Sequence, residues 1–189
     1  MKLISQVFWS GFLKFSGPHC DANCNYLWNG NFAITFPPCL FQVESGAIVE
    51  HLEKKFPDPS LEVEEMAEIS KVQSGFFPAM AKFIKAPSHQ QELEDNLLAQ
   101  LKILNDHLTK MDTIYFAGSK ISLVDFNLAP KLYHMDATLT EFYPEIQDKV
   151  KSYTALHKYM ETMFEERAFK DTIYSRETII WGWSAVRSN

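Results

Sequence analysis

The residues best suited to covalent chemistry are three cysteines in the first quarter of the chain, Cys20, Cys24 and Cys39. A deprotonated thiol is a strong nucleophile, and the neighbouring His19 favours the thiolate of Cys20. Cys20 and Cys24 are four residues apart, which could place both on one face of a helix. Redox-active dithiols instead have two residues between their cysteines. These residues leave the catalytic residue unassigned, with Cys20 as a candidate and an incidental loop thiol as the alternative.

A second set of polar residues, Glu44 and Ser45, precedes a predicted helix that carries Ile48, Val49 and Leu52. The free amides and positive dipole end of a helix N-terminus bind carboxylates. Ser45 can add a hydroxyl donor, and Glu44 can bind an ammonium group. The pair therefore suits a ligand that carries both an α-amino and an α-carboxyl group, while a simple helix cap is the alternative.

The six histidines are scattered along the chain, and none is spaced from a second ligand as metal sites require. We therefore predict no metal site. His134 lies in an apolar segment and is interpreted as a core histidine. Trp181 and Trp183 are expected to pack back across the protein.

The pattern of apolar residues changes at residues 56–60, where two prolines separated by one residue exclude a helix. Short apolar runs broken by Gly, Pro and Asn precede this point, and long helical periodicity follows it. We predict two domains, at residues 1–58 and 59–189.

Apolar spacing predicts four helices in the second domain, at residues 63–84, 88–111, 122–135 and 148–165. Pro78 is expected to kink the first of them. Ser88 and Gln91 are spaced as a capping box for the second helix, and Ser122 and Asp125 for the third. In the first domain, alternating apolar residues around the Pro37-Pro38 pair predict a hairpin of two short strands.

The overall composition limits the classes of function. The chain has 189 residues, of which 46% are hydrophobic, and its net charge is −6. This composition excludes a disordered tail, and the acidic balance argues against nucleic acid as a partner. No run approaches the roughly 20 apolar residues of a transmembrane helix, so no membrane span is expected. Three cysteines make no disulfide framework, which favours the cytosol or the stroma of an organelle.

Four segments carry a resemblance to a known family. They are Glu44-Ser45 with the following EHLEKKFPDPSL, then YFAGSKISLVDFNLAPKLYHMDATL, then YMETMFEERAFKDT, and finally ETIIWGW. Together they cover residues 30–183, and the sequence is similar to the glutathione transferase superfamily, most of all to the plant and algal dehydroascorbate reductases. The closing Gly182-Trp183 favours these reductases over the chloride-channel-like relatives.

The resemblance implies a mainly α fold, in which an all-helical glutathione-transferase-type C-terminal domain follows a reduced thioredoxin-like α/β portion. It implies glutathione as co-substrate, with no metal. Glu44 and Ser45 would bind the γ-glutamyl end of glutathione, and the backbone of Phe32 would pair with its cysteinyl part. Family members place a cis-proline after that position, where this chain has Ala33.

The chain departs from the family upstream, where no Cys-Pro-Phe-Cys or Cys-Pro-Phe-Ser motif is present. Two functional hypotheses follow. The first is a glutathione-dependent reductase that converts dehydroascorbate to ascorbate. The second is a non-catalytic subunit of a larger assembly, which would contact a protein partner through the apolar segment Gln6–Phe15.

Overall fold

The computed structural model describes residues 34–36, 40–42, 45–64 and 66–187. Their elements are β1 (Ile34–Phe36), β2 (Leu40–Gln42), α2 (Ser45–Lys55), α3 (Met66–Ser74), α4 (Phe76–Lys85), α5 (Gln91–Met111), α6 (Leu123–Phe142), α7 (Pro144–Lys151), α8 (Thr154–Glu165), α9 (Arg167–Lys170) and α10 (Arg176–Arg187). The described chain is therefore mainly α, as the sequence predicts.

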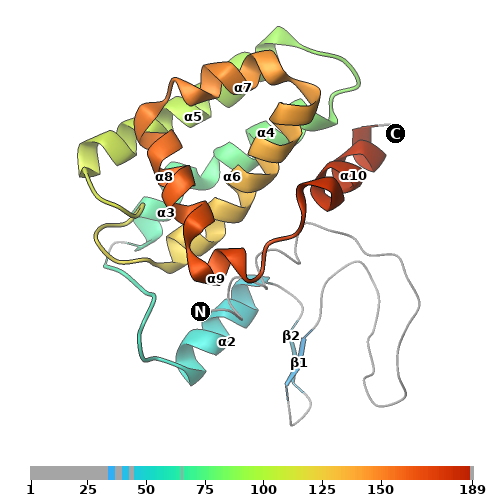
Figure 1. Ribbon diagram of the computed structural model, residues 1–189. Helices are drawn as coiled ribbons and strands as arrows, with labels where there is room; N and C mark the ends of the chain where they lie inside the picture. Colours follow the sequence, from blue (N-terminus) through green and yellow to red (C-terminus); the bar gives the residue numbers. More distant parts are fainter. Residues whose placement is uncertain (1–33, 37–39, 43–44, 65, 188–189) are drawn as a thin grey trace, which may run out of the picture.

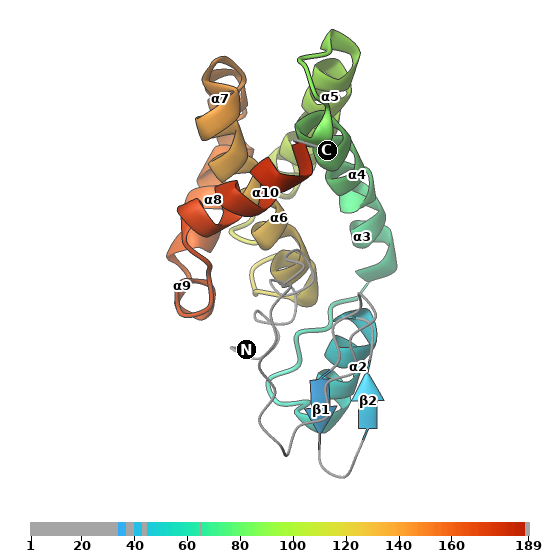
Figure 2. The same cartoon turned by 90° about the vertical axis from the view of Figure 1, so that its right-hand side faces the viewer.

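The helices from α3 to α10 form a bundle with α6 at its centre, while α2 and the strands lie at one end (Figure 1). The turned view in Figure 2 places α4 and α5 on one side of α6, and α7 and α8 on the other. The core is formed by buried apolar side chains from helices α4 to α10, with partly buried side chains of α3 packed against it; its members include Phe83, Leu101, Leu132, Met163 and Ile179.

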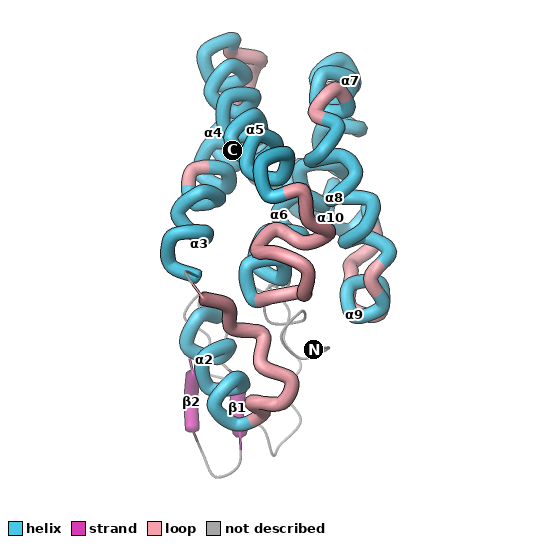
Figure 3. Tube along the Cα trace, turned by 90° about the vertical axis from the view of Figure 1, so that its left-hand side faces the viewer, coloured by secondary structure: helices cyan, strands magenta, loops and turns pink. Residues whose placement is uncertain are grey.

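The predicted hairpin is confirmed by the antiparallel pairing of β1 with β2, in which Thr35 lies opposite Phe41. Helix α2 follows β2 and reaches the bundle through a small apolar cluster of Val49, Leu52, Leu61 and Phe126. Figure 3 shows α2 between the strands and the lower ends of α3 and α6.

The segment between α2 and α3 is held at both of its sides. The buried Glu53 carboxylate accepts a hydrogen bond of 3.1 Å from the Leu61 amide, and the Leu61 carbonyl accepts one of 3.0 Å from the Leu123 amide. These bonds tie α2 to the start of α6. A domain boundary after residue 58 stays a prediction.

The single helix predicted over residues 63–84 is wrong, because α3 and α4 are separate. The break lies at Gly75, where an added Cβ would lie 2.3 Å from Oε1 of Gln100 on α5. Pro78 is the third residue of α4, so its missing amide removes no intrahelical hydrogen bond, because first-turn amides have no acceptor within the helix.

The helix predicted over residues 148–165 is also two helices, α7 and α8. The Asn105 side chain of α5 accepts hydrogen bonds of 3.2 Å from the Ala155 and Leu156 amides. These bonds satisfy the first amides of α8, so the helix starts at the point that Asn105 dictates. A contact across 50 residues leaves no local signal in the sequence.

The capping box predicted from Ser88 is wrong too, since α5 begins at Gln91 after Gln90. The Gln91 side chain donates forward to Asp95 instead, at 2.8 Å. The neighbouring His89 is drawn to Glu94, whose carboxylate lies 2.6 Å from the His89 ring and 2.6 Å from Nζ of Lys149.

Glu94 gives the fold a defined response to acid. The Lys149 ammonium, followed by His89, holds the pKa of this buried carboxyl below its ordinary value of 4.5. A carboxyl with a lowered pKa in the folded state stabilises the fold above its unfolded-state pKa, and the contribution is lost as the pH falls through the folded-state value.

We expect Glu94→Gln to lower the free energy of unfolding at pH 7 by about 1 to 3 kcal/mol, because charge-assisted hydrogen bonds are lost. The difference in the free energy of unfolding between Glu94→Gln and the unmodified protein should become smaller as the pH falls to about 3.5. Urea unfolding at both pH values measures this, with the exposed Glu92→Gln as control. A gap that stays constant with pH would contradict the assignment.

Candidate functional site

The start of α2 is the part of the predicted glutathione site that the structure describes. Ser45 is the first residue of α2, and β2 ends three residues earlier, at Gln42. This confirms that Ser45 lies at a helix N-terminus, where the first backbone amides have no acceptor within the helix. The predicted site residues Cys20, Phe32 and Glu44 lie outside the described residues.

Asp125, at the start of α6, has a carboxylate that accepts four hydrogen bonds from other residues. The capping box predicted from Ser122 and Asp125 is confirmed, with the Ser122 amide donating to Asp125 at 2.9 Å. The Ser122 hydroxyl, the Phe116 amide and the Tyr159 hydroxyl donate to the same carboxylate at 2.8, 2.8 and 2.9 Å. Asp125 therefore joins α6 to the preceding loop and to α8.

Burial raises the pKa of Asp125, while its hydrogen bonds act in the opposite direction. Four hydrogen bonds from protein groups reach its carboxylate, and the residue has no exposed surface. Asp125 is a structural anchor that fixes the start of α6, not a group that meets a substrate. The sequence revealed its capping role but not the bonds from Phe116 and Tyr159.

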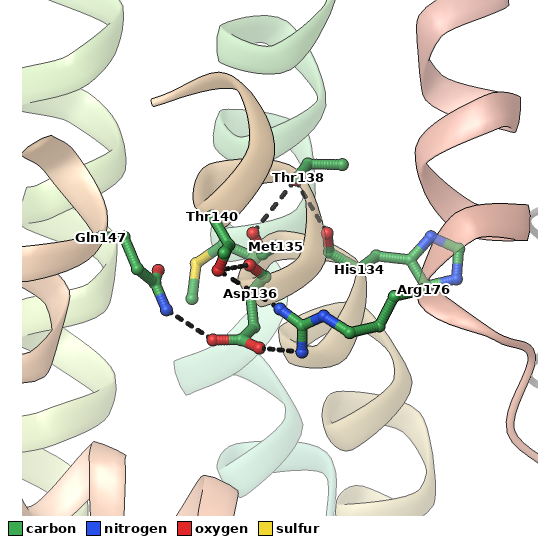
Figure 4. Close-up of polar contacts among 7 residues, drawn as sticks. All are labelled: His134, Met135, Asp136, Thr138, Thr140, Gln147 and Arg176. Atoms are coloured by element: carbon green, nitrogen blue, oxygen red, sulfur yellow. Dashed lines mark hydrogen bonds and ion pairs between the residues drawn. The ribbon is translucent and has the colours of Figure 1, made fainter. Parts of the chain in front are cut away.

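A second polar group joins α6 to the C-terminal helix (Figure 4). Asp136 forms an ion pair of 2.7 Å with Arg176, and it accepts a hydrogen bond from Gln147 on α7. Arg176 also donates to the Thr140 hydroxyl at 3.2 Å. These contacts fix the start of α10 against α6 and α7, so this group too is structural.

The core interpretation of His134 is confirmed. Its ring has no exposed surface, and Nδ1 accepts a hydrogen bond of 3.0 Å from the indole of Trp183 on α10. Burial lowers the pKa of His134 to about 3, so the ring is neutral near pH 7. Trp183 packs back as expected, whereas Trp181 is 69% exposed and that expectation is wrong.

Lys131 on α6 is a functional candidate that the sequence did not indicate. Its Nζ donates to the Asn127 side chain one turn earlier and lies 5.8 Å from the centre of the Phe77 ring on α4. Burial lowers the pKa of Lys131 to about 8. None of the ion pairs between described residues includes Lys131.

Two features of the described chain concern metals and membranes. Within the described ranges, no three His, Cys, Asp or Glu side chains are grouped so that they could hold a metal ion. No helix in the described part of the chain is long and apolar enough to cross a membrane.

Comparison with known proteins places these features in context. Residues 87–162 match the family described as "Glutathione S-transferase, C-terminal domain". Over 142 residues, the chain is 32% identical to glutathione S-transferase DHAR2 of Arabidopsis thaliana, a match that covers 75% of this chain and 65% of that protein. It is 34% identical over 144 residues to the chloroplastic DHAR3 of the same plant, covering 74% of this chain and 52% of that one.

Among solved structures, the dehydroascorbate reductase of Chlamydomonas reinhardtii is similar, with a TM-score of 0.70 and 27% sequence identity. The match covers 96% of this chain and 87% of that one. The chain thus spans between half and two thirds of the length of these two plant relatives and most of the algal protein.

Proposed function

The chain belongs to the glutathione transferase superfamily, among proteins similar to the plant and algal dehydroascorbate reductases, and from this membership we propose that it reduces dehydroascorbate with glutathione. One observation carries the proposal. The fold matches an algal dehydroascorbate reductase over 96% of this chain. The match includes the bundle and extends beyond it, although a shared fold alone does not fix an activity.

Glutathione would bind where the hairpin meets α2. The N-terminus of α2 offers amides to the γ-glutamyl carboxylate, and the Ser45 hydroxyl adds a donor. In the family pattern Glu44 binds the α-ammonium group, and the backbone of Phe32 pairs with the cysteinyl part. The proposal requires glutathione as co-substrate and no metal.

The reaction proceeds by thiol chemistry, with Cys20 as the proposed nucleophile. Its thiolate attacks a carbonyl carbon of dehydroascorbate and forms a carbon–sulfur bond. A first glutathione then attacks the enzyme sulfur, so that a mixed disulfide forms and the electron pair of the breaking bond remains with the sugar acid, which leaves as ascorbate. A second glutathione attacks the mixed disulfide, releases oxidised glutathione and restores the thiolate.

The test is glutathione-dependent reduction of dehydroascorbate by the purified full chain, together with Ser45→Ala. We expect turnover in the unmodified protein and a KM for glutathione about tenfold higher in Ser45→Ala, because one hydrogen bond to a charged group is lost. Ser74→Ala, at the exposed end of α3, is the matched control and should leave this KM unchanged. An unchanged KM in Ser45→Ala would contradict the placement of glutathione.

The competing function is a non-catalytic subunit of a larger assembly, and it is favoured by the absence of the family's Cys-Pro-Phe motif from the chain. Its partner surface would be the apolar segment Gln6–Phe15, which lies outside the described residues. A cooperatively melting protein that neither turns over nor binds glutathione would support this second function. For either function we propose the cytosol or the plastid stroma as the compartment.

A further inference from the structure

A buried acceptor without a donor lies one helical turn from the ring that faces Lys131. Gln73 on α3 is only 7% exposed, and its Oε1 accepts no hydrogen bond within the part of the chain that the structure describes. The intervening Gly75 keeps helical angles, with φ −78° and ψ −20°. Gln73 therefore lies one turn before Phe77 along the same side of α3 and α4.

Lys131, on the facing helix α6, is a cation without an anionic partner among the described residues. Both α3 and α4 pack against α6, and the Phe77 ring lies over the Lys131 ammonium. The ammonium of the half-buried Lys131 donates to the neutral side-chain amide of Asn127, so an added anion would stabilise this charge. The seam between α3–α4 and α6 thus carries a cation that lacks an anion and an acceptor that lacks a donor, counted among the described residues.

The seam lies at the end of the bundle that meets α2. Phe126 packs against Val49 and Leu52 of α2, and Asn127 is the next residue. Lys131 follows Phe126 by five residues, which corresponds to about 7.5 Å along the helix axis. Figures 2 and 3 both show the lower ends of α3 and α6 next to α2, the helix that Ser45 begins.

We propose that Lys131 and Gln73 bind the sugar-acid substrate and its product, with the Lys131 ammonium on the anionic oxygen of ascorbate and the Gln73 carbonyl on a hydroxyl group. This inference rests on the proposed function and extends it from glutathione to the second substrate. Dehydroascorbate is neutral, whereas ascorbate is a monoanion near pH 7. The negative charge that distinguishes ascorbate from dehydroascorbate is the charge that the Lys131 ammonium would bind.

The experiment measures sodium ascorbate and glutathione binding separately, by calorimetry without oxygen, in Lys131→Met, Lys131→Arg and Gln73→Met. We expect the Kd for ascorbate to rise at least about tenfold in Lys131→Met, since a charge-assisted hydrogen bond is lost, and to be largely restored in Lys131→Arg. Gln73→Met should raise it by a smaller factor. Glutathione affinity should stay unchanged in all three variants.

Lys102→Met is the matched control, because Lys102 is an exposed lysine of α5 that also bonds a residue one turn away, Asp106. Lys131→Met replaces a half-buried charge by an apolar chain of similar length, so thermal melting should show an intact fold. This melt separates a binding loss from a folding loss.

Three outcomes would overturn the inference. The first is ascorbate affinity that is equal in Lys131→Met and the unmodified protein. The second is an equal loss of affinity in the Lys102→Met control, and the third is no ascorbate binding by a protein that does bind glutathione. Each of these leaves the glutathione-dependent function standing, whereas that function fails only when glutathione binding and turnover are both absent.

Discussion

Asp125→Ala is expected to remove a large part of the stability of the fold. The substitution leaves four buried donors without this acceptor, namely the amides of Phe116 and Ser122 and the hydroxyls of Ser122 and Tyr159. Each unsatisfied buried donor costs about 1 to 3 kcal/mol, and the lost cap adds about 1 kcal/mol. A total of about 4 kcal/mol or more is a sizeable share of the 5 to 15 kcal/mol typical of a folded protein.

Thermal melting followed by circular dichroism measures the effect. For a chain of this size, 4 kcal/mol corresponds to a fall in Tm of about 8 to 16 °C. Tyr159→Phe removes only one of the hydrogen bonds to Asp125 and leaves no donor unpaired. Its Tm should therefore fall far less than that of Asp125→Ala. Asp95→Ala is the surface control, because Asp95 is exposed near the start of α5. A loss below about 1 kcal/mol in Asp125→Ala would contradict the anchoring role.

Cys20→Ser is expected to abolish turnover if the chain is a reductase. A serine hydroxyl is scarcely ionised near pH 7, so it can neither attack dehydroascorbate efficiently nor form a mixed disulfide with glutathione. Removal of a nucleophile lowers kcat by roughly three orders of magnitude or more. Steady-state reduction of dehydroascorbate, followed through the appearance of ascorbate, measures this loss.

Cys24→Ser and Cys39→Ser are the matched controls, because they remove the other two thiols of the chain. Both should retain turnover close to that of the unmodified protein. Retained activity in Cys20→Ser, together with its loss in Cys24→Ser, would show that the nucleophile is Cys24. A second readout does not depend on rates. The mixed disulfide with glutathione can be trapped and detected by mass spectrometry of the intact protein.

Local signals in the sequence were sufficient for the parts of the fold that a single turn controls. The capping box at Ser122 involves residues three apart, and the strand alternation around Pro37-Pro38 has a period of two, so both were predictable and both are present where described. Family resemblance reached further, since the mainly α fold and the glutathione transferase membership follow from motifs spread over most of the chain.

Features that depend on distant partners were not predictable. The α3–α4 break lies at Gly75, where a side chain would collide with Gln100, and the start of α8 reflects hydrogen bonds that its first amides donate to Asn105. Helical periodicity continues across both positions, because apolar spacing records which face is buried and not where another helix satisfies the backbone.

The sequence by itself determined the helical character of the chain, the cap at Ser122 and the helix start at Ser45, because such signals depend on neighbours within one turn. Only the tertiary structure decided that Asp125 joins three segments. The same holds for the seam of Lys131 and Gln73, where the cation has no anion and the Gln73 carbonyl no donor among the described residues. The physical reason is that desolvation and hydrogen-bond satisfaction arise from packing between segments far apart in the chain, and residue types alone do not encode them.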